Sequence, residues 1–294
     1  MKGYADIDWG NGDRLLILDA GSSKTYVAVL SRVESKVIQD LYLPPINAAL
    51  LNYDEILARL SPLRNCIETN DDVAYFGAGC MPGPNSEKIA EALQELGIRG
   101  SINVESDIIS AAISLLGNNS GIACILGTGS NTAKFSDTLM IETIPSLGYV
   151  LGDEGSGAAL GKRLVKALFR NQLSHDLLTA FTDETGQTYQ DVIEHVYRIP
   201  DSNRYLAQFT HFIKNHIDSK EIENLVTQEF ESFFINRILP YEGYQNLPIG
   251  VIGSVAKVFE DQLLNVAKSY DCKVVKIVSS PMDGLIEYFI GKRK

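Results

Sequence analysis

Two turns rich in glycine and hydroxyl residues could hold phosphate. Residues 18–25 read LDAGSSKT and residues 126–133 read LGTGSNTA, with leucine, glycine and serine in register. Glycine lets a backbone approach a ligand closely, and successive N–H groups of such a turn can surround phosphate oxygens. Any hairpin can need a glycine, but two matched copies favour a phosphate site. The residues predicted in this way are Gly21, Ser22, Ser23, Lys24 and Gly127.

Two aspartates stand beside these turns or open a helix. Asp19 ends the first strand, where its carboxylate could hold Mg²⁺ next to a phosphate. Asp107 follows a short predicted strand at 101–105 and opens a helix, where it could act as a general base toward a hydroxyl. Aspartate is also common at turns and helix starts, so the residue types alone leave a structural role open for both.

Two further glycine-containing segments could bind small molecules. Residues 148–157 read GYVLGDEGSG, with four glycines around the adjacent carboxylates Asp153 and Glu154, a pattern that suits vicinal sugar hydroxyls. A helix start with favourable charges is the alternative. Gly253 and Ser254 follow an apolar strand and could line adenine and ribose.

The elements that must position these residues follow a repeated pattern. Apolar segments at 14–19, 25–31 and 36–43 predict an antiparallel three-stranded meander, followed by strands at 72–77 and 101–105. The order restarts with strands at 121–126 and 131–136 and continues with strands at 248–252 and 273–278. Helices are predicted at about 53–60, 84–96, 107–116, 155–171, 255–268 and 282–291. This order predicts an α/β chain of two duplicated lobes that face each other across a cleft.

The predicted lobes have defined limits. The first covers residues 1–117, and the second covers 118–281 with a helical insertion at about 174–237. Residues 1–12 are expected to be a loose tail, and Trp9 receives no role. The four histidines, all in the insertion, lack metal-binding spacing and are expected to be surface or packing residues: His175, His195, His211 and His216.

Composition excludes several classes of partner. The chain has 294 residues, a formal net charge of −11 and hydrophobic residues at 45%. A strongly acidic chain is a poor partner for nucleic acid or an anionic membrane surface. The four cysteines, Cys66, Cys80, Cys124 and Cys272, show no CxxC spacing, and the N-terminus shows neither a secretory signal nor a membrane span. A reduced, cytoplasmic protein is expected, either a monomer or a homodimer.

The order of LDAGSSKT, LGTGSN, GDEGSG and VIGSVA resembles that of the phosphate, phosphate, sugar and adenosine segments of actin-like sugar kinases. The chain is most similar to the N-acetylglucosamine kinase group within the BadF/BadG/BcrA/BcrD ATPase family. The resemblance implies two ribonuclease-H-like lobes with mixed five-stranded sheets, ATP and Mg²⁺ as cofactors, and a last helix, at about 282–294, packed on the first lobe. It also implies phosphorylation of an amino sugar, N-acetylglucosamine, at its 6-hydroxyl.

The resemblance assigns residues as well. It implies that Asp107 is the catalytic base. It implies nucleotide contacts from the turn that ends at Thr25, from Thr128, and from Gly253 and Ser254. The sugar contacts that it implies are Asn47, Gly129, Ser130, Asn131, Gly148 and Asp153.

Two other functions remain open at this stage. One is the ATPase activator of a radical dehydratase, which shares the fold and holds an iron–sulfur cluster through cysteines. The other is a sugar-binding sensor without turnover. Among kinase substrates, N-acetylmuramic acid, glucosamine and glucose also remain open.

Overall fold

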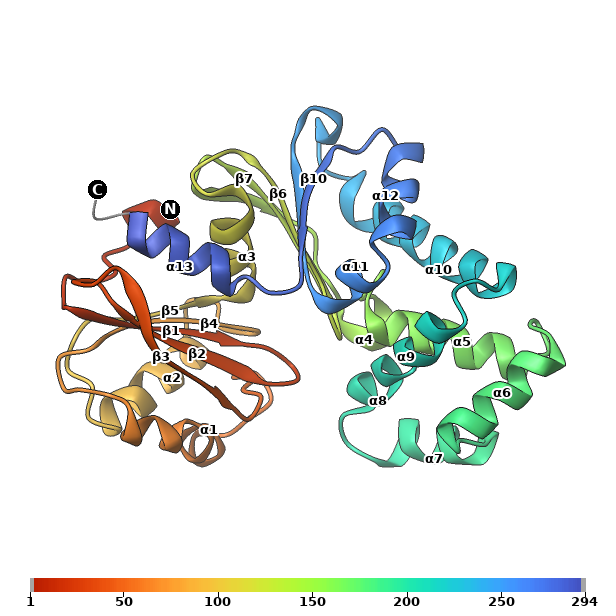
Figure 1. Cartoon of the computed structure of the whole chain (residues 1–294), viewed down its shortest axis with the longest axis horizontal. Coiled ribbons are helices and arrows are strands. Elements are labelled where there is room, and N and C mark those ends of the chain that lie inside the picture. The colour runs from red at the N-terminus through yellow and green to blue at the C-terminus, as the bar shows by residue number, and fades with distance from the viewer. Residues whose placement is uncertain (1–2, 292–294) are drawn as a thin grey trace. The chain divides into compact units, whose positions relative to one another are not determined.

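The computed structural model describes residues 3–291 and divides the chain into two compact units. The first unit runs up to residue 119 and adds residues 135–140 and the chain from 281 onward. The second unit comprises residues 120–134 and 141–280. Each unit contains the greater part of one five-stranded sheet with helices around it (Figure 1).

The first sheet has the strand order β3-β2-β1-β4-β5. Its strands are β1 (Arg14–Ala20), β2 (Thr25–Ser31), β3 (Lys36–Leu43), β4 (Asp72–Gly77) and β5 (Ile102–Ser106). β1, β2 and β3 form the predicted antiparallel meander, whereas β4 and β5 run parallel to β1. The apolar run Leu15–Leu18 in β1 is fully buried, as expected of a strand covered on both faces.

The helices of the first unit lie where the hydrophobic periodicity predicts them. They are α1 (Tyr53–Leu60), the 3₁₀ turn η2 (Ser61–Asn65), α2 (Pro84–Glu95), α3 (Asp107–Leu116) and α13 (Met282–Gly291). The last of these, α13, packs against α3 although the two are far apart in sequence.

The second sheet repeats this order as β10-β9-β6-β7-β8. Its strands are β6 (Gly121–Leu126), β7 (Ser130–Ser136), β8 (Leu139–Thr143), β9 (Ile249–Ile252) and β10 (Val274–Val278). β6, β9 and β10 are parallel. The two sheets of like order confirm the predicted duplicated α/β fold.

The helices of the second unit include one departure from prediction. The short α4 (Gly148–Leu151) and α5 (Gly157–Phe169) follow β8, while α11 (Ser254–Val258) and α12 (Glu260–Ser269) follow β9. The sequence predicts a single helix at 255–268, but the buried residue Phe259 leaves helical geometry and divides it in two.

Five helices fill the stretch between α5 and β9. They are α6 (His175–Thr185), α7 (Tyr189–Arg198), α8 (Ser202–Gln208), α9 (Thr210–Asn215) and α10 (Lys220–Phe233). The chain continues directly from α10 into a π-helical turn, η3 (Phe234–Ile238), and later into the 3₁₀ turn η4 (Tyr244–Asn246). Their aromatic side chains share one hydrophobic core with the second sheet.

The prediction of a loose N-terminal tail is wrong for residues 3–12, while residues 1–2 lie outside the described part of the chain. Tyr4, in the 3₁₀ turn η1 (Tyr4–Asp6), and Trp9 are 2% and 4% exposed. The Trp9 ring packs against Phe76 of β4 and Phe289 of α13, with centroid distances of 5.6 and 5.2 Å. Two buried aromatic rings therefore anchor this segment, although the polar residues around them predict an exposed one.

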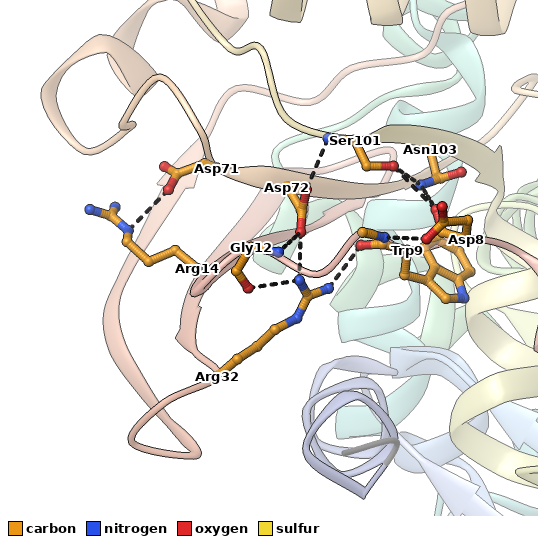
Figure 2. A network of polar contacts seen from close by, with 10 residues as sticks. Asp8, Trp9, Gly12, Arg14, Arg32, Asp71, Asp72, Ser101 and Asn103 are labelled. Atoms are coloured by element: carbon orange, nitrogen blue, oxygen red, sulfur yellow. Dashed lines mark hydrogen bonds and ion pairs between the residues drawn. The ribbon is translucent and has the colours of Figure 1, made fainter.

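A buried ion pair ties the same segment to the sheet (Figure 2). Arg32 Nη1 lies 2.5 Å from Asp72 Oδ2, and the Arg32 guanidinium also donates to the carbonyls of Trp9 and Gly12. Asp72 in turn accepts from the N–H groups of Gly12 and Ser101. This network lies at the amino ends of the parallel strands, at the opposite edge of the sheet from the candidate site.

Candidate active site

The first group of predicted site residues lies at the carboxyl edge of the first sheet. β1, β4 and β5 run parallel, with Asp19, Phe76 and Glu105 in register. Asp19 lies one residue before the end of β1, and Asp107 follows β5 directly as the first residue of α3. Carboxyl ends of parallel strands are the usual place for ligands in α/β sheets. The structure therefore brings the predicted Mg²⁺ ligand and the predicted base to one edge.

The two carboxylates influence each other. Burial, together with the charge of Asp107, raises the pKa of Asp19 to about 7. Asp107 is held by its neighbour Ser106, which caps α3 and donates a 3.2 Å hydrogen bond to Asp107 Oδ1. Two carboxyl groups that repel each other would gain from a bound divalent cation.

Asn47 lies close to the same edge. It follows β3, and its Oδ1 accepts a 3.0 Å hydrogen bond from Ala49 N. Gly79 lies two residues beyond the end of β4. If Gly79 carried a Cβ atom, that atom would lie 3.4 Å from Asn47 Oδ1. The predicted sugar residue of this unit is therefore next to the segment that follows β4.

The first glycine turn is exposed except at its end. Gly21 N donates to Lys24 O at 3.0 Å, which closes the turn. Lys24 Nζ lies 4.0 Å from the centroid of the Tyr42 ring, in a cation–π contact that fixes the ammonium group beside the turn. Thr25 is fully buried and its hydroxyl donates to Pro44 O, so its side chain stabilises the end of the turn.

In the second unit, the turn of residues 127–129 is held by the start of α5. Gly127 N donates to Gly129 O at 3.0 Å. Gly127 O and Thr128 O accept from Gly157 N and Ala158 N at 2.8 and 3.1 Å. These N–H groups of α5 are thus used within the fold, and the turn itself has a fixed shape.

Gly253 packs against the same turn. Its φ is +136°, and a side-chain carbon there would lie only 2.1 Å from Leu126 O. Glycine is therefore required by the close approach of two backbones, a reason independent of any nucleotide. Ser254 is exposed, and a nucleotide contact from this pair rests on the resemblance alone.

The segment 144–155, which we call the sugar loop because sugar contacts are predicted for it, carries Gly148, Asp153 and Glu154. Positive φ angles occur at Leu147, Gly148, Asp153 and Gly155. Asp153 is buried, its N–H donates to Ser146 O at 3.0 Å, and its Oδ1 accepts from Ser130 N at 3.4 Å.

The loop thereby meets the turn that begins β7. A side-chain carbon at Gly129 would lie 3.0 Å from Asp153 Oδ2, so Gly129, Ser130 and Asp153 form one cluster. Asn131 is next in β7, and its Oδ1 accepts from Thr132 N at 2.9 Å. Glu154 is half-buried beside Asp153. Five of the predicted sugar residues of this unit therefore lie together: Gly129, Ser130, Asn131, Asp153 and Glu154.

Sequence reasoning missed a buried cation near this cluster. Arg237 is 1% exposed, and its Nη1 donates to Pro145 O at 2.8 Å. Burial raises the pKa of Asp153, and the Ser130 N–H and the Arg237 charge act against that rise. An arginine inside the apolar run FFINRIL was the available signal, because arginine is rarely buried without a specific partner.

The predicted set divides between the two units. Asp19, Asn47, Asp107 and the turn of residues 21–25 belong to the first unit, and all the others belong to the second. Within residues 3–291, no three His, Cys, Asp or Glu side chains form a ready metal site. Mg²⁺ in phosphate-binding sites commonly has only one or two protein carboxylates, so Asp19 remains a suitable ligand.

Comparison with known proteins identifies the family. No protein-family model matches the chain. The N-acetylmuramic acid/N-acetylglucosamine kinase of Clostridium acetobutylicum is 24% identical over 223 residues, which cover 70% of this chain and 72% of that protein. A solved structure from Porphyromonas gingivalis, provisionally named N-acetylglucosamine kinase, is 35% identical with a TM-score of 0.88, and covers 95% of this chain and 100% of its own. The chain belongs to the N-acetylglucosamine kinase-like family.

Members of this family are sugar kinases of the actin-like ATPase fold, so the predicted family, fold and class of ATP-dependent kinase are confirmed. A second structure, from Chromobacterium violaceum and of the same provisional name, is 19% identical with a TM-score of 0.72 over 94% of this chain and 99% of its own. At that identity it supports the fold alone. No helix within residues 3–291 combines the length and apolar character needed to cross a membrane.

Proposed function

We propose that this chain transfers the γ-phosphoryl group of ATP to the 6-hydroxyl of N-acetylglucosamine. The observation that carries the proposal is the position of Asp19 and Asp107 at one carboxyl edge of the first sheet, with Asn47 close by. A carboxylate that opens a helix at such an edge is placed to accept a proton from a bound hydroxyl. The names of the relatives from Clostridium acetobutylicum and Porphyromonas gingivalis support an amino sugar as the acceptor.

The residues have separate tasks in this proposal. Asp107 orients the attacking hydroxyl and takes up its proton. Asp19 holds Mg²⁺, which supplies charge neutralisation on the phosphate oxygens when bound. The turn of residues 21–25 and the turn at Gly127 and Thr128 hold phosphates, with Gly253 and Ser254 toward the nucleoside.

The sugar contacts are assigned mostly to the second unit. Asp153 and Glu154 accept hydrogen bonds from sugar hydroxyls, since ionised carboxylates bind neighbouring hydroxyl pairs well. The full set of proposed sugar residues is Asn47, Gly129, Ser130, Asn131, Gly148, Asp153 and Glu154.

The cysteines disfavour the radical dehydratase activator. All four are buried. Burial raises the pKa of the Cys80 thiol to about 12 and that of the Cys272 thiol to about 11, and it raises the pKa values of Cys66 and Cys124 as well. Thiolates bind metal, and these thiols are kept protonated and enclosed.

A coupled ADP-release assay over a sugar panel tests the proposal. N-acetylglucosamine, N-acetylmuramic acid, glucosamine and glucose are compared at equal concentration with ATP and Mg²⁺. The highest kcat/KM is expected for N-acetylglucosamine. 6-Deoxy-N-acetylglucosamine should compete with it and release no ADP.

Three results would contradict parts of the proposal. ADP release together with a phosphorylated product from the 6-deoxy sugar would move the transfer to another hydroxyl. A higher kcat/KM for another sugar would change the acceptor. Sugar binding by calorimetry without any ADP release would identify a sensor in place of an enzyme.

A further inference from the structure

The π-helical turn that follows α10 buries a positive charge beneath the sugar loop. Arg237 lies in this turn, Phe234–Ile238, and is 1% exposed. Its Nε and Nη2 atoms are buried and find no hydrogen-bond partner within residues 3–291. A buried guanidinium is costly unless opposite charges lie nearby, and single π turns are frequent at functional sites.

The opposite charges nearby come mostly from the sugar loop. The groups that interact electrostatically with Arg237 are, from the strongest, Glu154, Tyr241, Asp153 and Cys124. Two of these four are the adjacent carboxylates that the proposed function assigns to the sugar. Arg237 thus offers these carboxylates a counter-charge from inside the protein.

The chain segment around Arg237 also fixes the loop at both ends. At its start, Ile144 N donates to Tyr241 Oη at 3.2 Å and Pro145 O accepts from Arg237 Nη1 at 2.8 Å. At its end, Gly155 N donates to Glu229 Oε1 at 3.0 Å. These three side chains come from one stretch, α10 and the residues that follow it.

The supports are themselves held in place. Glu229 is 5% exposed, and its Oε2 accepts a 2.7 Å hydrogen bond from Arg163 Nε. Tyr241 is fully buried, and its hydroxyl lies 2.9 Å from Thr132 Oγ1 in β7. Buried and bonded groups of this kind lose little entropy when a ligand binds, so the loop they hold is preorganised.

We propose that Arg237 is a positioning residue for the sugar, which holds the start of the sugar loop and supplies a buried positive charge near the Asp153 and Glu154 carboxylates. The inference rests on the proposed function, because it assigns sugar contacts to those two carboxylates. It extends that function by naming a residue that sets sugar affinity without touching the sugar. Tyr241 and Glu229 assist it through the loop backbone.

The charge of Arg237 should influence how sugar binding depends on pH. The groups that act on the Asp153 carboxyl are the Ser130 N–H from β7, Arg237 from the π turn, Lys162 from α5 and Glu154 from the loop. Burial and Glu154 raise the pKa of Asp153, while the other three lower it. Removal of the Arg237 charge should therefore raise the pKa of Asp153 further. As the pH falls, Asp153 should then become protonated, and sugar binding should weaken, at a higher pH than in the wild type.

The test compares Arg237→Gln and Arg237→Lys with the wild-type chain. Arg237→Gln is expected to raise the KM for N-acetylglucosamine at least about tenfold, with kcat and the KM for ATP changed less than about threefold. The acid limb of kcat/KM for the sugar should move to higher pH in Arg237→Gln. In Arg237→Lys, which keeps the positive charge, the acid limb should lie at the same pH as in the wild type. Arg204→Gln, at an exposed arginine of α8 in the same unit, is the matched control and should leave all values unchanged.

Several outcomes decide the inference. An unchanged sugar KM in Arg237→Gln, or equal rises in the KM for sugar and for ATP, would overturn it. If Arg237→Gln does not fold, Tyr241→Phe takes its place, because it releases Ile144 N, and an unchanged sugar KM in that variant would also overturn it. If the wild type binds sugar without turnover, the proposed function fails, and calorimetric Kd values of the same variants still decide the role of Arg237.

Discussion

Burial of Asp19 near the end of β1, together with the charge of the Asp107 carboxylate at the start of α3, raises the pKa of Asp19 to about 7. This relationship lies within the first unit and joins two residues that are 88 positions apart in the sequence. Two acidic groups kept close at a strand edge store unfavourable electrostatic energy. Such an arrangement is typical of a site that a cation or a reacting group completes.

The first prediction concerns Asp107 as a base. Asp107→Asn should lower kcat by about 10²–10⁴-fold, because the hydroxyl loses its proton acceptor while its binding partners stay. The KM values for sugar and ATP should change less than about threefold. Steady-state ADP release measures both. Glu105→Gln, two residues earlier in β5, is the control and should keep most of the turnover. A variant Asp107→Asn with more than a tenth of the wild-type kcat would remove Asp107 from the role of base.

The second prediction concerns the stability cost of Asp19. Its pKa is about 7 in the folded chain and 3.8 as the ordinary value, so the ionised form opposes folding. This cost is absent at low pH, appears as the pH rises above about 4, and is complete above about 7. Asp19→Asn should therefore stabilise the chain at pH 8 by roughly 2 kcal/mol. This is about half of the free energy that corresponds to the full pKa difference, because Asp19 is partly exposed and solvent screens its charge.

Chemical denaturation at pH 5 and pH 8 measures this difference. The gain from Asp19→Asn should be clearly smaller at pH 5. Asp183→Asn, at an exposed position of α6, is the matched control. The same Asp19→Asn chain should lose Mg²⁺-dependent turnover, which would separate stability from function. An equal gain at both pH values would contradict the raised pKa.

The third prediction concerns the buried ion pair of Arg32 and Asp72 (Figure 2). Asp72→Asn should destabilise the chain by about 3–5 kcal/mol, because Arg32 then keeps a buried charge without its counter-ion. Below the melting transition, kcat should remain near the wild-type value, since the pair lies at the amino ends of the strands. Thermal or chemical unfolding measures the loss. Glu223→Gln breaks the exposed Lys220–Glu223 pair and should cost less than about 1 kcal/mol. Similar losses in both variants would contradict the argument.

Local patterns in the sequence were sufficient for most of the fold. The apolar run Leu15–Leu18, the glycine turns and the restart at Gly121 predict every strand of the two sheets except β8, because alternation and turn residues are local signals. The N-terminal segment was misjudged since its two anchors, Tyr4 and Trp9, are isolated aromatics whose burial depends on β4, β7 and α13. No local pattern reports contacts of that kind.

The difference between local sequence patterns and contacts of distant segments also applies to the site. Asp19, Asp107 and Asp153 stand beside strand ends or glycine turns, which single them out in the sequence. Arg237 and Glu229 lie inside a long helical stretch without a turn or spacing to mark them, and the apolar run around Arg237 indicates its burial but not its partners. Their relation to the sugar loop arises from packing between segments about 75 to 90 residues apart, as the contacts of Glu229 with Gly155 and of Arg237 with Pro145 illustrate. Supporting residues of this type become visible only in three dimensions.

The last prediction separates two reasons for glycine at position 253. Gly253 has a φ of +136° and would place a side-chain carbon 2.1 Å from Leu126 O, whereas Gly83 has a φ of +142° with nothing within 4 Å. Gly83→Ala should thus cost only the backbone strain of about 1–3 kcal/mol. Gly253→Ala adds a backbone collision and should cost more than about 4 kcal/mol, with the β9–α11 connection displaced from the 127–129 turn. Denaturant unfolding of both variants measures the difference, and equal losses would show that the close approach to Leu126 carries no energetic weight.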